Sequence, residues 1–144
     1  MKHSIGGVQY YIIFIDDCRR YTEVYFLITK TAEEISAKFQ HYQAWVETQK
    51  FHFKRFRSDN RFREYSNSTF LGVLGEEGVT FEPLGPLYTQ HKNKTVELMI
   101  QTLNVKARSM MLDANVLIIF WPEAIRTICY LHRMSPILST TDNR

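Results

Sequence analysis

The sequence predicts an α/β fold in which strands and helices pack as layers. Two runs near the amino terminus are dense in aromatic and β-branched residues, which favour strands. Longer stretches repeat apolar residues at helical spacing, and the two kinds of segment alternate along the chain. Of the 144 residues, 44% are hydrophobic and 23% are charged, so the composition is that of a folded protein and excludes a fully disordered chain.

A β-hairpin opens the predicted fold. Residues 10–15 form its first strand and residues 22–29 its second, and the short polar link between them suggests antiparallel pairing. A helix follows at residues 32–49, with Thr31 as its N-cap. Its apolar residues recur at helical spacing, at Ile35, Phe39, Tyr42 and Val46.

Weaker patterns define the rest of the chain. We expect a strand at 51–57, a short helix at 66–74, a short strand at 78–82, a loop at 83–93, a long helix at 95–112 and a last helix at 120–132. The apolar stripe of the long helix consists of Val96, Ile100, Leu103, Ala107 and Met110. The apolar run at 116–121 is expected to be buried, and an exposed run would instead form an interface.

Charge and cysteine content limit the functional classes. The net charge of +3 permits a polyanionic partner without requiring one. Cys18 and Cys129 lie far apart and no C-x-x-C occurs, which argues against a disulfide framework or a zinc knuckle and favours a reducing compartment. No apolar run approaches the roughly 20 residues that span a bilayer, so we expect a soluble, intracellular protein.

A basic segment at residues 50–63 has two interpretations. Its Lys and Arg residues alternate with phenylalanines, a pattern found on nucleic-acid surfaces, where cations meet phosphates and rings stack on bases. The same pattern is typical of a strand that buries its rings and solvates its charges. We favour burial of the rings and leave the role of the charges open.

Eight short segments together resemble one family. They occur in order as SIGG at 4–7, FIDD at 14–17, RYTEVYFL at 20–27, RSDN at 57–60, YTQHKN at 88–93, ARSM at 107–110, FWPEA at 120–124 and YLHRMSP at 130–136. The chain resembles the integrase catalytic core of Ty1/copia-type retrotransposons, within the retroviral-integrase and ribonuclease-H-like superfamily. The resemblance implies a ribonuclease-H-like mixed sheet flanked by helices at residues 1–138, a polar tail at 139–144, DNA integration as the function, and the nucleus as the location.

The resemblance also implies a metal site. In the family, three carboxylates hold two Mg²⁺ (or Mn²⁺) ions that promote transfer of a DNA phosphodiester. Asp59 in RSDN matches the second carboxylate and Glu97 in TVEL matches the third. Basic residues near them are expected to contact DNA, or RNA, through phosphates: Lys54, Arg55, Arg57, Lys92, Lys94 and Arg108. A homodimer is a further expectation from the family.

The first carboxylate of the family has no match in this sequence. In the family it lies on the central strand of the sheet, upstream of the segment that SIGG matches. We therefore expect a sheet without its middle strand, a site with two of three ligands and an inactive core. Arg61–Arg63 replaces a glycine pair of the family beside Asp59, and Lys94 replaces a glycine, so the core also looks degenerate.

Other interpretations of the same residues remain open. An Asp-Asn pair after a strand, such as Asp59-Asn60, is most often a turn. Glu97 shares a helix face with Gln101 and Arg108, which is typical of a solvated face. The tempting Asp16-Asp17 pair is interpreted as part of the hairpin turn. The alternative functions are a non-catalytic nucleic-acid-binding module and a decayed transposon product without function.

Overall fold

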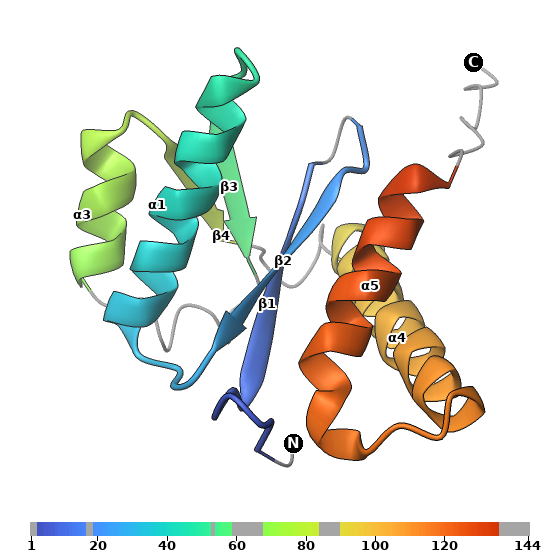
Figure 1. Cartoon of the computed structure of the whole chain (residues 1–144). Coiled ribbons are helices and arrows are strands. Elements are labelled where there is room, and N and C mark those ends of the chain that lie inside the picture. The colour runs from blue at the N-terminus through green and yellow to red at the C-terminus, as the bar shows by residue number, and fades with distance from the viewer. Residues whose placement is uncertain (1–2, 17–18, 53, 59–67, 84–89, 136–144) are drawn as a thin grey trace, which may run out of the picture.

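A computed structural model describes residues 3–16, 19–52, 54–58, 68–83 and 90–135. Its four strands lie between two helical layers, with α1 and α3 on one side and α4 and α5 on the other (Figure 1). The elements are β1 (Tyr10–Ile15), β2 (Thr22–Leu27), α1 (Ala32–Thr48), β3 (Arg55–Ser58), α3 (Ser68–Glu76), β4 (Thr80–Pro83), α4 (Gln90–Asp113), a 3-10 turn (Ile118–Phe120) and α5 (Trp121–Met134). The α/β class predicted from the sequence is confirmed. The predicted tail at 139–144 lies outside the described residues.

The predicted hairpin is confirmed. β1 and β2 pair antiparallel, with Tyr10 opposite Leu27 and Ile15 opposite Thr22. The Asp16 N–H donates to the Tyr21 carbonyl at 2.8 Å and continues the ladder to the turn. The β-branched and aromatic side chains of both strands pack on the two faces of the hairpin, which is the arrangement that favours such residues in strands.

The other two strands form a separate sheet. β3 and β4 run parallel, with Arg55 opposite Thr80 and Arg57 opposite Glu82, and α3 lies in the connection between them. β3 begins at Arg55, so the strand predicted at 51–57 starts later than expected. Among the described residues the strands thus form two two-stranded sheets rather than one continuous sheet.

The start of α1 is fixed by its capping residues. Thr31 is the N-cap, and its hydroxyl accepts a hydrogen bond from the Glu34 N–H. The Glu34 carboxylate reaches back to the N–H groups of Ile28 (2.9 Å) and Thr29 (2.8 Å). The cap therefore joins the end of β2 to the first turn of α1 and sets the direction in which the helix leaves the hairpin.

Two hydrophobic clusters form the core, one on each face of the strands. The first cluster joins β2 to α4 and α5 through Val24, Leu103, Ala107, Trp121, Ile125 and Ile128. The second joins β1 to α1 and α3 through Phe14, Phe39, Tyr42, Phe70 and Leu74. Phe39 lies at the centre of the second cluster, with its ring 5.1 Å from Phe56 and 5.4 Å from Phe70.

The structure corrects three details near α4. The helix begins at Gln90, so the predicted loop at 83–93 extends too far. Val96 and Ile100 were expected in the buried stripe but are 37% and 36% exposed. The buried residues of α4 are Leu103, Ala107 and Met111. Met110, which was expected in the stripe, is partly buried and packs against the cluster with α5, as does Met99.

The apolar run at 116–121 is also different from the main expectation. Val116, Leu117 and Ile118 are exposed, and Leu117 is 67% exposed. Burial begins with Trp121, where α5 starts. The run therefore connects α4 to α5. The first half of the run is exposed to solvent, which was the alternative to a buried segment.

Candidate metal and nucleic-acid site

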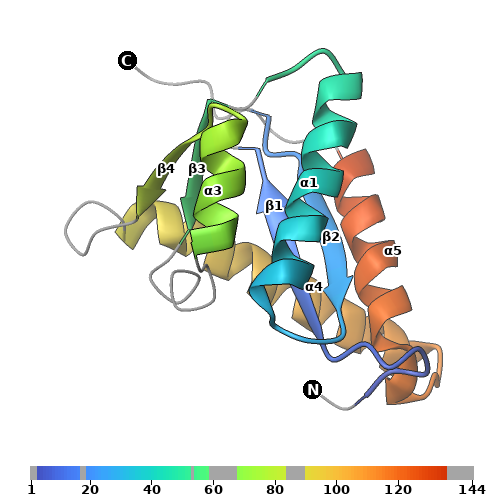
Figure 2. The same ribbon diagram turned by 90° about the vertical axis from the view of Figure 1, so that its left-hand side faces the viewer.

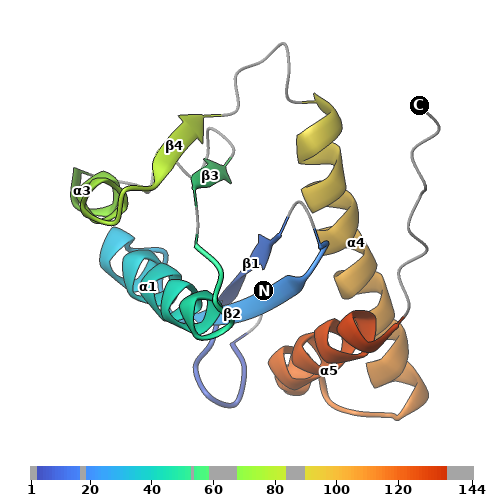
Figure 3. The ribbon, with the colours of Figure 1, turned by 90° about the horizontal axis from the view of Figure 1, so that it is seen from above.

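Of the two predicted metal ligands, Glu97 is described by the structure and Asp59 is not. Asp59 lies outside the described residues, but Ser58, its neighbour in the chain, is the last residue of β3. Two perpendicular views show the carboxyl ends of β3 and β4 on the same side of the molecule as the amino-terminal turns of α4 (Figures 2 and 3). The chain therefore leaves β3 on the side where the first turns of α4 lie.

Glu97 is exposed and lies seven residues after the start of α4, two turns into the helix at 3.6 residues per turn. It was expected in the first turn. Residues seven apart share a helix face, so Glu97 lies on the same face as Asn104. The Asn104 side chain accepts a hydrogen bond from the Tyr11 hydroxyl of β1 at 2.9 Å. This contact places Asn104 against the hairpin, whereas Glu97, two turns earlier, is exposed.

The described residues do not contain a group of three or more His, Cys, Asp or Glu side chains that could hold a metal ion. Within the described part of the chain, Glu97 thus does not belong to such a three-residue group. A hard cation at Glu97 would need further oxygen ligands, because Mg²⁺ prefers an octahedral set of oxygens. Asp59 is the candidate that the sequence offers, and its placement remains a prediction.

The basic residues of β3 have an acidic partner. The Arg57 guanidinium bonds to Glu82 of β4 at 2.8 Å, and Arg55 lies 3.5 Å from the same carboxylate. The pairs follow from the parallel register, which sets Arg57 opposite Glu82. Part of the predicted positive charge of this strand is therefore neutralised within the sheet, whereas Lys54 just before it is exposed.

Exposed cations also occur on α4. Lys94 and Arg108 are both exposed and lie fourteen residues apart, which returns to nearly the same helix face, and Glu97 lies close to that face. Lys92 lies in the first turn of α4, and its side chain is outside the described set. The face of α4 that bears Glu97 thus carries two of the predicted phosphate-contacting residues.

The described aromatic residues of the basic segment differ in burial. Phe56 is half-buried and packs on Phe39, Phe70 and Phe81, as the strand interpretation predicts. Phe51 is 42% exposed and lies under the Arg19 guanidinium, 3.8 Å from the ring centroid. Phe53 and Phe62 are outside the described residues.

A groove on the other side of the hairpin was not predicted from the sequence. This groove, called the β2 groove below, has a volume of about 400 Å³ and lies between α1 and α5 over β2. Its lining includes Val24 and Phe26 of β2, Lys38 and His41 of α1, and Arg126 and Arg133 of α5. A signal was present in the sequence, because Lys38 and His41 are three residues apart and Arg126 and Arg133 are seven apart, both spacings that keep side chains on one helix face.

Comparison with known proteins connects this architecture to a mobile element. Over 134 residues, 92% of the chain, the sequence is 39% identical to the retrovirus-related Pol polyprotein from transposon TNT 1-94 of Nicotiana tabacum. The chain is related to a segment of a retrotransposon Pol polyprotein. This supports the transposable-element part of the resemblance to the Ty1/copia type.

The chain spans 10% of the length of that polyprotein. The similarity therefore relates this chain to one segment of a much longer protein. No family model matches the chain. Within the described residues, no helix is both long and apolar enough to cross a membrane.

Proposed function

We propose that the chain is the part of a Ty1/copia-type integrase catalytic core that follows its first strand, with a ribonuclease-H-like fold. The similarity to a Pol polyprotein over 92% of the chain carries this proposal, because a match of that extent includes most of the stretch in which the eight segments occur. The combination of an antiparallel hairpin and a parallel strand pair between two helical layers is compatible with it.

The edge of β1 supports the idea of a missing middle strand. In an antiparallel pair, the backbone N–H and C=O groups of every second residue hydrogen-bond to the partner strand. The backbone groups of the residues between them point away from it. The bond between Asp16 and Tyr21 fixes that alternation, so Tyr11, Ile13 and Ile15 direct their backbone groups away from β2. No described residue pairs with these groups, which leaves an edge that one further strand could occupy.

Asp59 and Glu97 are proposed to hold the divalent cation. Carboxylate oxygens are the ligands that Mg²⁺ and Mn²⁺ prefer. Such a cation, when bound, polarises a phosphoryl oxygen and activates the attacking one. Lys94, one turn from Glu97 on α4, would hold the DNA backbone beside the carboxylates through a phosphate, and Arg108, three turns farther along the helix, would contact a more distant phosphate.

The 144-residue chain is proposed to be catalytically inactive. In-line displacement at phosphorus needs ions held precisely on both sides of the reacting atom. The two family ligands matched here are the second and the third, and the first carboxylate has no match in this sequence. The chain should therefore retain weak cation binding and DNA binding while it fails to cut a phosphodiester.

A nicking assay tests this proposal. Purified chain, whose fold is checked by circular dichroism, is incubated with supercoiled plasmid and Mg²⁺ or Mn²⁺. We expect no more nicked product than in the same reaction with Asp59→Asn. Metal-dependent nicking by the unchanged chain that disappears in Asp59→Asn and Glu97→Gln would contradict the inactivity and would show that the two carboxylates suffice.

A second candidate function is nucleic-acid binding without chemistry. The exposed Lys54, Lys94 and Arg108 favour it, because exposed cations bind phosphates in a salt-dependent way. Under this alternative, Lys94→Gln and Arg108→Gln weaken binding of a labelled DNA duplex, and Glu97→Gln leaves it unchanged or stronger. Affinity that does not fall as salt is raised would contradict both functions and favour a decayed product.

A further inference from the structure

The floor of the β2 groove is an open strand edge. Because the Asp16–Tyr21 bond fixes the alternation of the hairpin, Glu23 and Tyr25 hydrogen-bond to β1. Val24 and Phe26 then direct their backbone N–H and C=O groups to the outer edge of β2. Both residues line the groove, so these groups face the space between α1 and α5.

The open stretch of this edge has defined limits. At one end, the Thr22 carbonyl accepts the Cys129 thiol at 3.4 Å. At the other end, the Ile28 N–H donates to the Glu34 carboxylate at 2.9 Å. Between these limits, no described residue bonds to the backbone groups of Val24 and Phe26. An unpaired N–H and C=O row of this kind is a template for an added strand.

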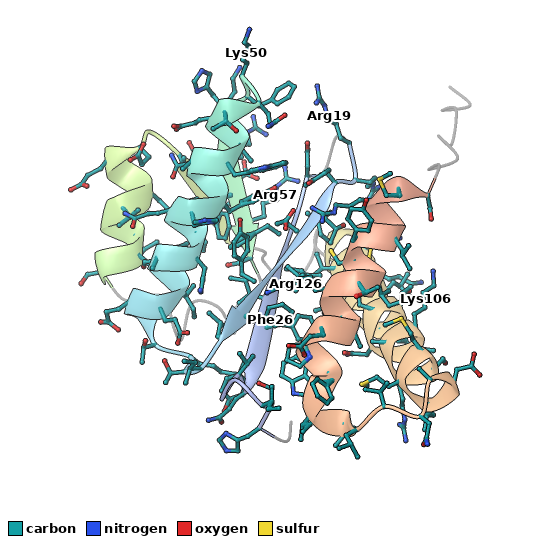
Figure 4. All side chains as sticks on the ribbon, viewed as in Figure 1. Arg19, Phe26, Lys50, Arg57, Lys106 and Arg126 are labelled. Atoms are coloured by element: carbon teal, nitrogen blue, oxygen red, sulfur yellow. The ribbon has the colours of Figure 1, made fainter. Side chains whose placement is uncertain are left out.

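The walls of the groove are basic. Lys38 and His41 stand on α1, and Arg126 and Arg133 stand on α5. Among the lining residues Glu23 is the one carboxylate, and Arg133 already pairs with it. Figure 4 shows Arg126 beside Phe26, and its guanidinium lies 5.1 Å from the ring centroid. Lys38 and Arg126 therefore face the open edge from opposite walls.

We propose that the β2 groove binds a short, extended acidic peptide of a partner protein, which adds to β2 as a further strand. Successive side chains of a strand point to opposite faces. Two consecutive acidic residues in such a peptide would meet Lys38 on one wall and Arg126 on the other. This inference is independent of the proposed integrase function, since it uses neither Asp59 nor Glu97.

Two other occupants fit less well. A second copy of the chain would bring the same cations against Lys38 and Arg126, and like charges across an interface are unfavourable. Nucleobases would need free ring faces, but Tyr21 and Trp45 already stack on each other with centroids 4.9 Å apart. Arg133 also lies over the Tyr21 ring at 5.3 Å. The strand edge and the charge together favour the peptide.

Fluorescence anisotropy at low ionic strength tests the proposal. The probe is the fluorescein-labelled peptide acetyl-TVEEVTV-amide, and its partner peptides are acetyl-TVKKVTV-amide and acetyl-TVEPVTV-amide. We expect the acidic probe to bind, the lysine version to bind at least about tenfold more weakly because its charge is reversed, and the proline version to lose binding because it removes a strand N–H.

Variants of the protein separate the groove from general charge effects. Arg126→Gln and Lys38→Gln should each weaken the acidic probe by about tenfold, the loss expected for one charge-assisted contact. Lys106 is an exposed residue of α4 that does not line the groove. Lys106→Gln also removes one positive charge, and it should leave the affinity for the acidic probe unchanged. Thermal unfolding of each variant shows whether it folds. The two groove variants test the two walls of the groove separately.

Three outcomes would overturn the inference. The first is absence of binding by the acidic probe to the folded chain. The second is equal weakening by Lys106→Gln, which would indicate non-specific charge attraction. The third is tight binding of a labelled thymidine heptanucleotide that Arg126→Gln abolishes while the acidic peptide fails to bind, which would make the groove a nucleic-acid site. The nicking assay has no bearing on any of them.

Discussion

Glu34 shows how one side chain can fix the junction between a strand and a helix. Its carboxylate accepts hydrogen bonds from two backbone N–H groups at the end of the hairpin, those of Ile28 and Thr29. Partial burial disfavours the charged form, but the hydrogen bonds from Thr29 and Ile28 outweigh it and hold the pKa of Glu34 below its usual value. The ionised carboxylate therefore stabilises the folded chain.

This gives a pH-dependent prediction. Because the folded pKa is lowered, the stabilisation is complete above the pKa of the carboxyl in the unfolded chain and is lost as the pH falls through the folded pKa. Glu34→Gln should lower the free energy of unfolding by about 1 kcal/mol at neutral pH, with a smaller difference in acid. Urea unfolding at several pH values measures this. Glu33→Gln is the control in the same helical turn, and equal effects of the two substitutions at every pH would contradict the cap.

Cys129 reports on the packing of α5 against β2. Its thiol is buried and donates to the Thr22 carbonyl, and desolvation raises its pKa to about 11. Since the thiolate is the reactive form, the folded protein should protect Cys129 from thiol reagents at pH 8. In a Cys18→Ser background, Ellman's reagent should react only as the chain unfolds. Rapid reaction under native conditions would show that α5 does not cover this strand.

At the scale of elements, the predicted hairpin and α1 were right because their signals are local. Each strand of the hairpin is a run of β-branched and aromatic residues, and α1 has both a cap at Thr31 and a regular apolar stripe. The cap and the buried face of α1 follow from neighbours a few residues away in the sequence. Such patterns survive in a single sequence without knowledge of the rest of the fold.

α4 was only partly predictable for the opposite reason. Its first turn, Gln90 to Asn93, is polar and contains no apolar repeat, so the sequence gives no sign of a helix there. Val96 and Ile100 have the spacing of a buried stripe, but burial depends on which part of the helix packs against another element. The same limitation applies to the β2 groove, which forms from three segments distant in sequence.

Phe39 provides a test of the packing between elements. Its ring is fully buried and contacts Phe14 of β1, Phe56 of β3 and Phe70 of α3. Phe39→Ala should therefore destabilise the chain by about 3–5 kcal/mol, since it removes buried surface and leaves a cavity. Chemical denaturation measures this loss. Leu112→Ala, at a residue that is 72% exposed, should change stability by less than about 0.5 kcal/mol.

If Phe39→Ala instead changes stability no more than Leu112→Ala, the second hydrophobic cluster does not hold the two sheets together. The distinction matters because the described strands of the two sheets do not hydrogen-bond to each other. In that arrangement, side chains from α1 provide much of the connection between the hairpin and the β3–β4 pair. If these side chains do connect the two sheets, Phe39→Ala should make unfolding less cooperative as well as less costly in free energy.

At the scale of the molecule, two layers of helices hold a divided sheet, and the unpaired edge of β1 lies beside the division. In the family that the chain resembles, a further strand lies at this edge and carries the first carboxylate of the triad. Under the proposed function, a strand at this edge would complete both the sheet and the metal site. No property of one element could reveal this, because it depends on how β1 and β3 are arranged relative to each other.

The proposed function depends on the convergence of Asp59 and Glu97 on one cation. The most direct measurement is Mn²⁺ titration of the ¹⁵N-labelled chain, in which amides near a bound ion lose intensity. We predict losses centred on residues 94–101 that disappear in both Glu97→Gln and Asp59→Asn and persist in Glu123→Gln, which alters an exposed carboxylate of α5. Intensity losses elsewhere, or losses near Glu97 that Asp59→Asn leaves unchanged, would contradict the account.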